Sequence, residues 1–292
     1  MEKSMKTVTI KAPAKVNLTL DDTGKRPNGY HDLKMIMQTI SVFDEIKLSL
    51  TEEEKIDLHM NKELPDKIPA EKNLVYKAAA LMKEKFDIKG GFDIELQKNI
   101  PAAAGLAGGS SDCAATLIAI NEVCELGLTT QELCDIGVKL GADVPFCIRK
   151  GTMLSEGIGE ILTPLTPFKD VWVVLVKPDI SVSTAYVYTH LDLPNLKYHP
   201  DTDKAIECID NGDIAGLSNV LSNVLETVTV PEYPVLTEIK EFLVQNGAAG
   251  SLMSGSGPTV FGIFKNKEDA RRAYDKANEK YIGYDVLICQ TM

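Results

Sequence analysis

The most constraining feature of the sequence is a run of small residues that joins a strand pattern to a helix pattern. Phe92, Ile94 and Leu96 alternate with polar residues, as in a half-buried strand. Residues 101–111 follow as PAAAGLAGGSS, and apolar residues then recur at helical spacing. Small residues let the backbone approach an anion, and the unpaired N–H groups of a helix start point toward it. The segment therefore predicts a phosphate-binding loop.

The end of this loop adds two hydroxyl groups, from Ser110 and Ser111, which can bind a phosphate or Mg²⁺. It is not a Walker loop, because no GK[ST] ends it, and no βαβ repeat surrounds it as in a dinucleotide site. The alternative to a phosphate site is that the loop residues are small only to allow tight packing. A helix is predicted from Ser110, and its start directly after Gly108 and Gly109 favours the anion site.

The two halves of the chain differ in texture, which indicates two domains. At roughly 150 residues per domain, 292 residues correspond to about two. Strands and helices alternate up to about residue 160. They include a helix that a Thr129–Glu132 capping box begins and whose apolar face extends to Leu140. Helical patterns over 202–226 and 234–246 dominate afterwards. We expect an α/β (α+β) protein with domains at 1–160 and 161–292.

The charge balance argues against two classes of partner. Lys and Arg number 31 and Asp and Glu number 42, so the formal net charge is −11. Nucleic acids and anionic membranes both repel such a chain, and we expect neither as a partner. Phosphate ligands remain possible, because backbone N–H groups and one or two local Lys residues can hold them.

The cysteines and the apolar segments of the sequence indicate the cellular compartment of the protein. The six cysteines form no CxxC pair and several lie among apolar residues, which predicts reduced thiols. The first residues, MEKSMKTVTIKAP, contain no apolar core of a signal peptide. The longest strongly apolar run, 171–176, is too short to span a membrane. We therefore expect a cytoplasmic protein.

Two charged residues are candidates for chemistry. Lys15 shares the polar face of a predicted strand over 14–20 with Asn17, where it could activate a hydroxyl or neutralise a phosphate. A lone lysine on a strand is usually solvated. Asp143 lies among apolar residues just beyond a predicted helix end, so we expect it to be partly buried and to need a partner or a task. A lone Asp at a helix end is more often a turn residue.

Two further segments suit ligand recognition. Tyr30 and His31 follow a turn over 23–29 that contains Asn28, and an aromatic beside an imidazole suits a flat ring. Alternatively, Tyr30 belongs to the core and His31 to the surface. A second glycine-rich loop at 253–258 again predicts a close approach of the backbone to a ligand.

Taken together, the lysine strand, the loop at 101–111 and the loop at 253–258 resemble the GHMP small-molecule kinase superfamily. The blocks APAKVNL (12–18), GYHDL (29–33) and LGADVPF (140–146) narrow the resemblance to kinases that phosphorylate a cytidyl-diphosphate methylerythritol. Alanines replace some loop residues that are often glycine, which leaves the loop small.

The resemblance implies a fold and a reaction. The fold would be the two-domain GHMP kinase fold, with an N-terminal domain of the ribosomal protein S5 domain 2-like type and a C-terminal ferredoxin-like α+β domain. The active site would lie in the cleft between them. The enzyme would transfer the γ-phosphoryl group of ATP to the 2-hydroxyl of its substrate, in the non-mevalonate route to isoprenoid precursors.

The resemblance also implies roles for single residues. Asp143 would accept the proton of the attacking hydroxyl, and Lys15 would hold both groups and stabilise the developing charge. Asn73 and Lys98 would lie near the nucleotide base, and Ser111 would be the protein neighbour of Mg²⁺ bound through ATP. The ATP phosphates would be bound by the loop residues Pro101, Ala102, Ala103, Ala104, Gly105, Leu106, Ala107, Gly108, Gly109, Ser110 and Ser111.

For the other substrate, Tyr30 and His31 match the positions that hold and read the cytosine. Tyr188 would be the second ring of that pocket, or else a packing tyrosine on a helix. Asn17 and Thr184 would contact the substrate as well.

Two other functions compete with this one. Another GHMP kinase, acting on mevalonate or homoserine, would lack the Gly-Tyr-His block. A non-catalytic sensor of the same fold would be expected to lose Lys15 or Asp143, and both are present. We expect a monomer or a weak homodimer.

Overall fold

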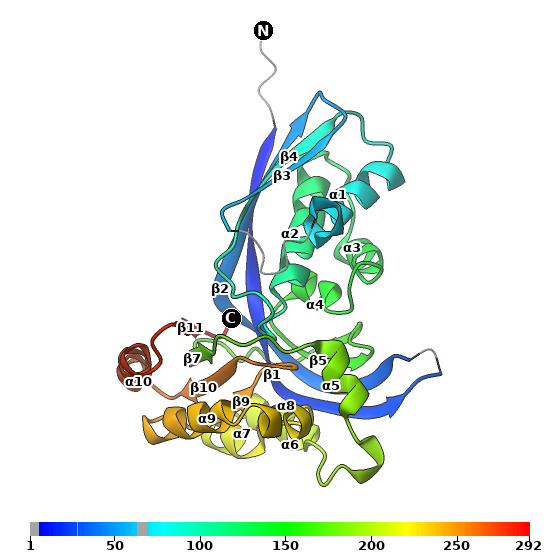
Figure 1. The fold of residues 1–292 in the computed structure, drawn as a ribbon. Coiled ribbons are helices and arrows are strands. Elements are labelled where there is room, and N and C mark those ends of the chain that lie inside the picture. Colours follow the sequence, from blue (N-terminus) through cyan, green and yellow to red (C-terminus); the bar gives the residue numbers. More distant parts are fainter. Residues whose placement is uncertain (1–5, 28, 63–68) are drawn as a thin grey trace. The chain divides into compact units, whose positions relative to one another are not determined.

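The computed structural model describes residues 6–27, 29–62 and 69–292, so the predicted turn residue Asn28 lies outside the described residues (Figure 1). Two compact units are interleaved along the sequence. The first comprises Met1–Ala14, Val42–Ala102 and Ala107–Arg149, and the second comprises Lys15–Ser41, Ala103–Leu106 and Lys150–Met292. A single domain boundary near residue 160 remains a prediction.

Two long strands supply residues to both units, β1 (Thr7–Lys25) and β2 (His31–Thr51). In the first unit, β2 pairs antiparallel with β4 (Gly91–Gln97), and β4 pairs in parallel with β3 (Ile56–Met60). The alternation predicted for β4 is confirmed, because its apolar residues Phe92, Ile94 and Leu96 are buried.

Helices cover one side of this part of the sheet (Figure 1). They are η1 (Ala70–Lys72), α1 (Leu74–Lys85), α2 (Gly108–Val123), α3 (Thr130–Gly137) and α4 (Val144–Arg149). The predicted capping box of α3 is present, since Thr129 Oγ1 accepts from the Glu132 N–H and the Glu132 carboxylate accepts from the Thr129 N–H. The helix ends at Gly137, earlier than the apolar period to Leu140 indicates, because a turn closed by the Gly141 N–H on Gly137 O follows.

In the second unit, the first half of β2 pairs antiparallel with β5 (Thr152–Gly157), which pairs with β6 (Ile161–Pro164). A separate four-stranded antiparallel sheet has the order β11 (Asp285–Gln290), β7 (Trp172–Lys177), β10 (Val260–Phe264) and β9 (Gly250–Met253). Helices α9 (Val235–Gln245) and α10 (Lys267–Lys280) pack on this sheet. The α+β class predicted from the sequence is confirmed.

The helical stretch predicted over 202–226 is divided in the structure. It contains α6 (Thr202–Asp210), α7 (Ile214–Val220) and the two-residue strand β8 (Ser222–Asn223), with α8 (Glu226–Glu232) at its end. The break has a local cause, because Asp213 caps α7 and Asn223 pairs in parallel with β1. Before this stretch lie α5 (Thr184–His190) and η2 (Leu193–Asn195).

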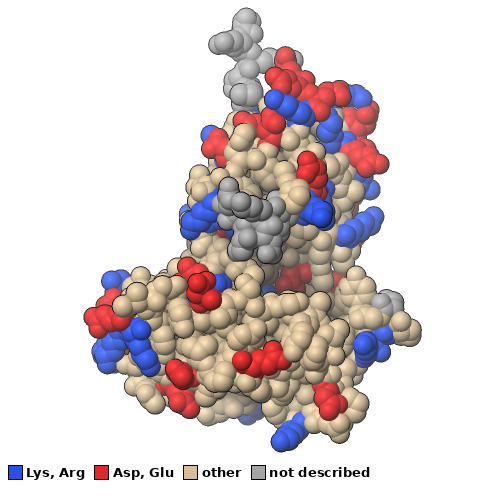
Figure 2. All heavy atoms as spheres, in the orientation of Figure 1, with Lys and Arg blue, Asp and Glu red and all other residues tan. Residues whose placement is uncertain are grey.

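The structure shows how the charged residues and the cysteines of the sequence are distributed. On the face shown in Figure 2, acidic and basic side chains are interspersed among larger uncharged areas. All six cysteines are free, and five of them are buried. Among the described residues, no helix combines the length and the apolar character needed to cross a bilayer.

Candidate active site

The small-residue loop contributes to both units, with residues 103–106 in the second and the remainder in the first. Helix α2 begins at Gly108, two residues before the predicted start, because Ala107 takes the left-handed N-cap position with a φ of 56°. An alanine methyl group accepts no hydrogen bond, so this N-cap leaves the first-turn N–H groups without a side-chain acceptor. Such a helix start is suited to an anion.

The second glycine-rich loop supports the first within the second unit. Ser254 Oγ donates to Gly105 O at 2.9 Å. A Cβ on Gly105 would lie 2.1 Å from Ser254 O, and a Cβ on Gly255 would lie 3.2 Å from Gly105 O. The loop at 253–258, which the sequence singled out as ligand-contacting, therefore packs directly on residues of the phosphate-loop segment.

Lys15 is buried, in contrast to a typical strand lysine. It is 5% exposed, and its Nζ donates to Asn17 Oδ1 at 2.7 Å. Its backbone N–H donates to Leu106 O at 3.1 Å, and a Cβ on Gly255 would lie 3.6 Å from its Nζ. The ammonium is thus held beside both glycine-rich segments of the second unit. A buried cation needs such polar neighbours.

Asp143 belongs to the first unit. It directly precedes α4, is partly exposed, and accepts from the Cys147 N–H through its backbone oxygen at 3.0 Å. The partial burial expected for this residue is present. Its pairing with Lys15 remains a prediction.

His31 and Tyr188 meet in the second unit. Their ring centroids are 4.9 Å apart with planes tilted by 45°. His31 Nδ1 lies 2.5 Å from Asp22 Oδ2, and burial raises the pKa of Asp22 although His31 opposes this shift. Tyr30 is 57% exposed, so it is not a core residue. Asp22 was missed in the sequence, where only its place at the end of an apolar strand sets it apart.

The other residues expected at the substrate or the nucleotide have local partners. Thr184, in the first turn of α5, shares a hydrogen bond of 2.8 Å with Ser256 of the second loop. Asn73 caps α1, because its Oδ1 accepts from the Val75 N–H at 2.9 Å. The Lys98 ammonium is bound by two buried carboxylates.

Ser111 is almost fully buried, and its Oγ donates to Pro13 O at 2.7 Å. The oxygen keeps its lone pairs, so it fits a metal site as a single ligand and not as part of a cage. Across the described part of the chain, no three His, Cys, Asp or Glu side chains are grouped so that they could hold a metal. Mg²⁺ bound mainly through nucleotide phosphates and water needs no such group.

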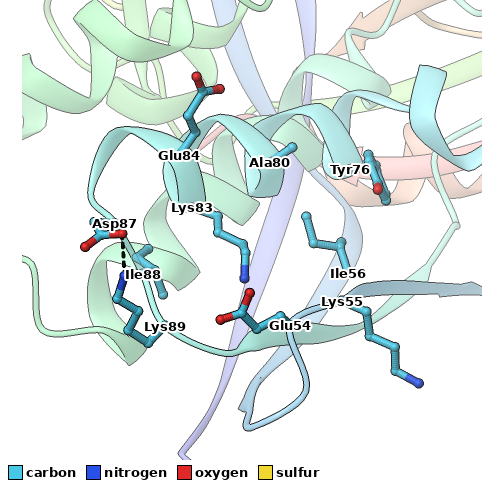
Figure 3. Close-up of a pocket in the computed structure, with 10 residues that line it drawn as sticks. All are labelled: Glu54, Lys55, Ile56, Tyr76, Ala80, Lys83, Glu84, Asp87, Ile88 and Lys89. Atoms are coloured by element: carbon cyan, nitrogen blue, oxygen red, sulfur yellow. Dashed lines mark hydrogen bonds and ion pairs between the residues drawn. The ribbon is translucent and has the colours of Figure 1, made fainter.

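A cavity of about 710 Å³ lies elsewhere on the first unit, between the start of β3, helix α1 and the residues that follow α1 (Figure 3). Its lining is mostly charged, with Lys89 bonded to Asp87 at 2.6 Å and Lys55 to Glu53 at 2.8 Å. It contains none of the residues predicted to bind a ligand.

Comparison with known proteins covers most of the chain. The family described as "GHMP kinases N terminal domain" matches residues 73–151, and "GHMP kinases C terminal" matches residues 205–283. The chain is 49% identical over 271 residues to the 4-diphosphocytidyl-2-C-methyl-D-erythritol kinase of Lachnoclostridium phytofermentans, covering 92% of each chain. It is 50% identical to that of Alkaliphilus oremlandii, covering 93% of this chain and 92% of that one.

Solved structures of kinases match the fold of this chain. A crystal structure of 4-(cytidine 5'-diphospho)-2C-methyl-D-erythritol kinase matches with a TM-score of 0.82 and 30% identity, over 97% of this chain and 99% of that one. A homoserine kinase from Cytophaga hutchinsonii matches with a TM-score of 0.78 but only 18% identity, over 100% and 96% of the two chains, and so shows the fold alone. The two-domain GHMP kinase fold predicted from the sequence is confirmed. The chain belongs to the GHMP kinases and, among these ATP-dependent small-molecule kinases, to the 4-diphosphocytidyl-2-C-methyl-D-erythritol kinase family.

Proposed function

We propose that this chain transfers the γ-phosphoryl group of ATP to the 2-hydroxyl of 4-diphosphocytidyl-2-C-methyl-D-erythritol. The observation that carries the proposal is the buried Lys15 ammonium, held by Asn17 beside two glycine-rich segments in a chain half identical to kinases of this name. A buried cation beside a phosphate loop can stabilise the charge that develops during phosphoryl transfer.

In the proposed reaction, the substrate hydroxyl gains the phosphoryl group and loses its proton. The substrate hydroxyl oxygen attacks the γ-phosphorus, the bond from that phosphorus to the β-phosphate oxygen breaks, and ADP leaves. Asp143 accepts the hydroxyl proton, and Lys15 orients the same hydroxyl. Phosphoryl transfer asks mainly for positioning and electrostatic stabilisation, which these two groups and the loop supply.

The loop at 101–111 holds the ATP phosphates through first-turn N–H groups of α2. Mg²⁺, when bound, neutralises charge on the β- and γ-phosphates, with Ser111 Oγ as its protein neighbour. Asn73 and Lys98 lie toward the nucleotide base in this proposal.

The cytosine is held between Tyr30 and Tyr188 and read by His31. The carboxylate of Asp22 at Nδ1 favours the Nδ1–H tautomer, so Nε2 is the ring's acceptor. Asn17 and Thr184 contact the remainder of the substrate. The enzyme works in the cytoplasm as a monomer or a weak homodimer, and light scattering on the purified chain measures that state.

The decisive experiment is a coupled assay of ADP release with ATP and Mg²⁺, offering the cytidyl substrate, mevalonate and homoserine in parallel. Turnover with the cytidyl substrate alone is expected, and Asp143→Asn serves as the inactive control. Turnover with another alcohol instead would contradict the cytosine pocket while leaving the kinase. ATP binding without turnover of any alcohol would favour a sensor.

A further inference from the structure

Three buried charged side chains in the first unit form ion pairs next to the phosphate loop. They are Asp44 near the middle of β2, Lys98 just after β4, and Asp112, the fifth residue of α2, and we call them the ionic clamp. Lys98 Nζ donates to Asp112 Oδ2 at 2.7 Å and to Asp44 Oδ2. The three side chains are 8%, 0% and 5% exposed for Lys98, Asp44 and Asp112.

The ionic clamp is bonded to both ends of the phosphate loop. Asp44 Oδ1 accepts from the N–H groups of Asn99 and Ile100, at 2.5 and 2.8 Å, and these residues immediately precede the loop. Asp112 immediately follows the loop and lies just after the first turn of α2. One ammonium therefore connects the backbone before the loop with the helix after it.

Lys98 also lies against the start of α2. A Cβ built on Gly108 would be 3.3 Å from Lys98 Nζ and 3.1 Å from Ile100 Cγ2. The ammonium thus packs next to the first residue of the helix, whose N–H groups point toward the proposed phosphate position. A shift of the ionic clamp would move that helix start.

The ionic clamp is costly to bury. Burial lowers the pKa of Lys98, but the carboxylates of Asp112 and Asp44 outweigh it and raise that pKa, so the ammonium stays charged. Two acidic side chains face one cation, and Asp112 Oδ1 is buried without a hydrogen-bond partner. A buried ionic group of this kind is often less stabilising than apolar residues of similar volume. Stability alone is therefore a poor explanation of it.

We propose that the ionic clamp sets the geometry of the phosphate loop for phosphoryl transfer, with Asp44 and Asp112 as positioning residues. Lys98 then acts through the loop and not by direct contact of its ammonium with the nucleotide. The inference rests on the proposed binding of ATP phosphates by residues 101–111. Its magnitude follows from geometry, because a misplacement of about 1 Å near the reacting groups can reduce the rate about 100-fold.

Steady-state kinetics of three variants test this. Asp112→Ala removes the tie to α2 and is expected to raise the KM for ATP about 10-fold and lower kcat at least as much. The KM for the alcohol substrate should change less than about twofold, since the ionic clamp lies in the first unit next to the loop. Asp112→Asn keeps an oxygen acceptor for Lys98 and should recover most of the kcat. Glu95→Gln is the matched control, because Glu95 pairs with Lys47 across the same two strands at 2.8 Å but is half exposed.

Wild-type KM for ATP and kcat in folded Asp112→Ala would overturn the proposal. So would losses that only follow the folded fraction, or an equal rise in both KM values, since these indicate a merely structural role. If Asp112→Ala does not fold, the same kinetic constants of Asp44→Asn decide. The side-chain oxygen of that asparagine can still accept from the N–H groups of Asn99 and Ile100, but its NH₂ group cannot accept from Lys98. Failure of the proposed function is separate, since it appears as the wild-type enzyme not phosphorylating the cytidyl substrate.

Discussion

Gly105→Ala is a stringent test of the contact between the two glycine-rich loops. Gly105 has a φ of +72°, which L side chains rarely adopt, and a Cβ there would lie 2.1 Å from Ser254 O and 3.2 Å from Gly257 O. Both obstacles are backbone atoms, so no side-chain rotation can relieve the overlap. The loops must separate, and the hydrogen bond from Ser254 Oγ to Gly105 O lengthens with them.

The expected loss of stability has two parts. The left-handed backbone costs an alanine about 1 kcal/mol, and overpacking of a tight site costs about 1–3 kcal/mol more. A chain of 292 residues unfolds with an entropy of about 0.6 kcal/mol/K. The melting temperature should therefore fall by about 3–7 °C.

Gly283→Ala is the matched control. Gly283 has a φ of +86°, with nothing within 4 Å of the added Cβ, so only the backbone cost of about 1 kcal/mol applies. Its melting temperature should fall by about 2 °C, with the KM for ATP unchanged. Differential scanning calorimetry and ATP titrations compare the two, and Gly105→Ala should also raise the KM for ATP about 10-fold. Equal thermal losses in the two variants would refute the argument that the loops are in close contact.

Three further predictions concern single groups. Asp143→Asn should reduce kcat by about 1,000-fold while calorimetry still detects ATP binding, and near-wild-type turnover would exclude Asp143 as the proton acceptor. Tyr188→Ala should raise the KM for the cytidyl substrate about 10-fold and leave that for ATP unchanged, whereas Tyr186→Ala, an exposed residue of the same helix, should change neither. Burial raises the pKa of Asp112 to about 7, so the folded chain retains a proton that the unfolded chain releases near pH 4. Stability should therefore fall as pH rises from about 4 to about 7, relative to Asp112→Asn, by an amount on the order of 1–3 kcal/mol, and a stability difference that does not vary with pH would contradict this.

The sequence was informative wherever a pattern is local. The alternation of β4, the capping box at Thr129 and the small-residue loop each depend on neighbours within a few residues, and all three are present in the structure. The early start of α2 was missed because it depends on a left-handed alanine, Ala107, where most N-caps are polar and extended.

Long-range electrostatic partners were not predictable. Asp44 and Lys98 are 54 positions apart, and Lys98 and Asp112 are separated by a whole loop, so no periodicity connects them. The burial of Lys15 depends on distant residues as well. The sequence left open whether Lys15 contacts a ligand or is solvated. The structure buries it, and its neighbours Leu106 and Gly255 lie far along the chain.

The interleaving of the two units also shapes how the chain can emerge from the ribosome. Residues 33–38 of β2 pair with residues 152–157 of β5, so about 120 residues of synthesis separate the two partners. At about 5–20 residues per second, that edge of β2 waits roughly 6–24 s for its neighbour. The waiting edge includes Met35, Ile36 and Met37, which are buried in the finished protein. During translation this enzyme therefore exposes an apolar strand edge of the kind that chaperones cover.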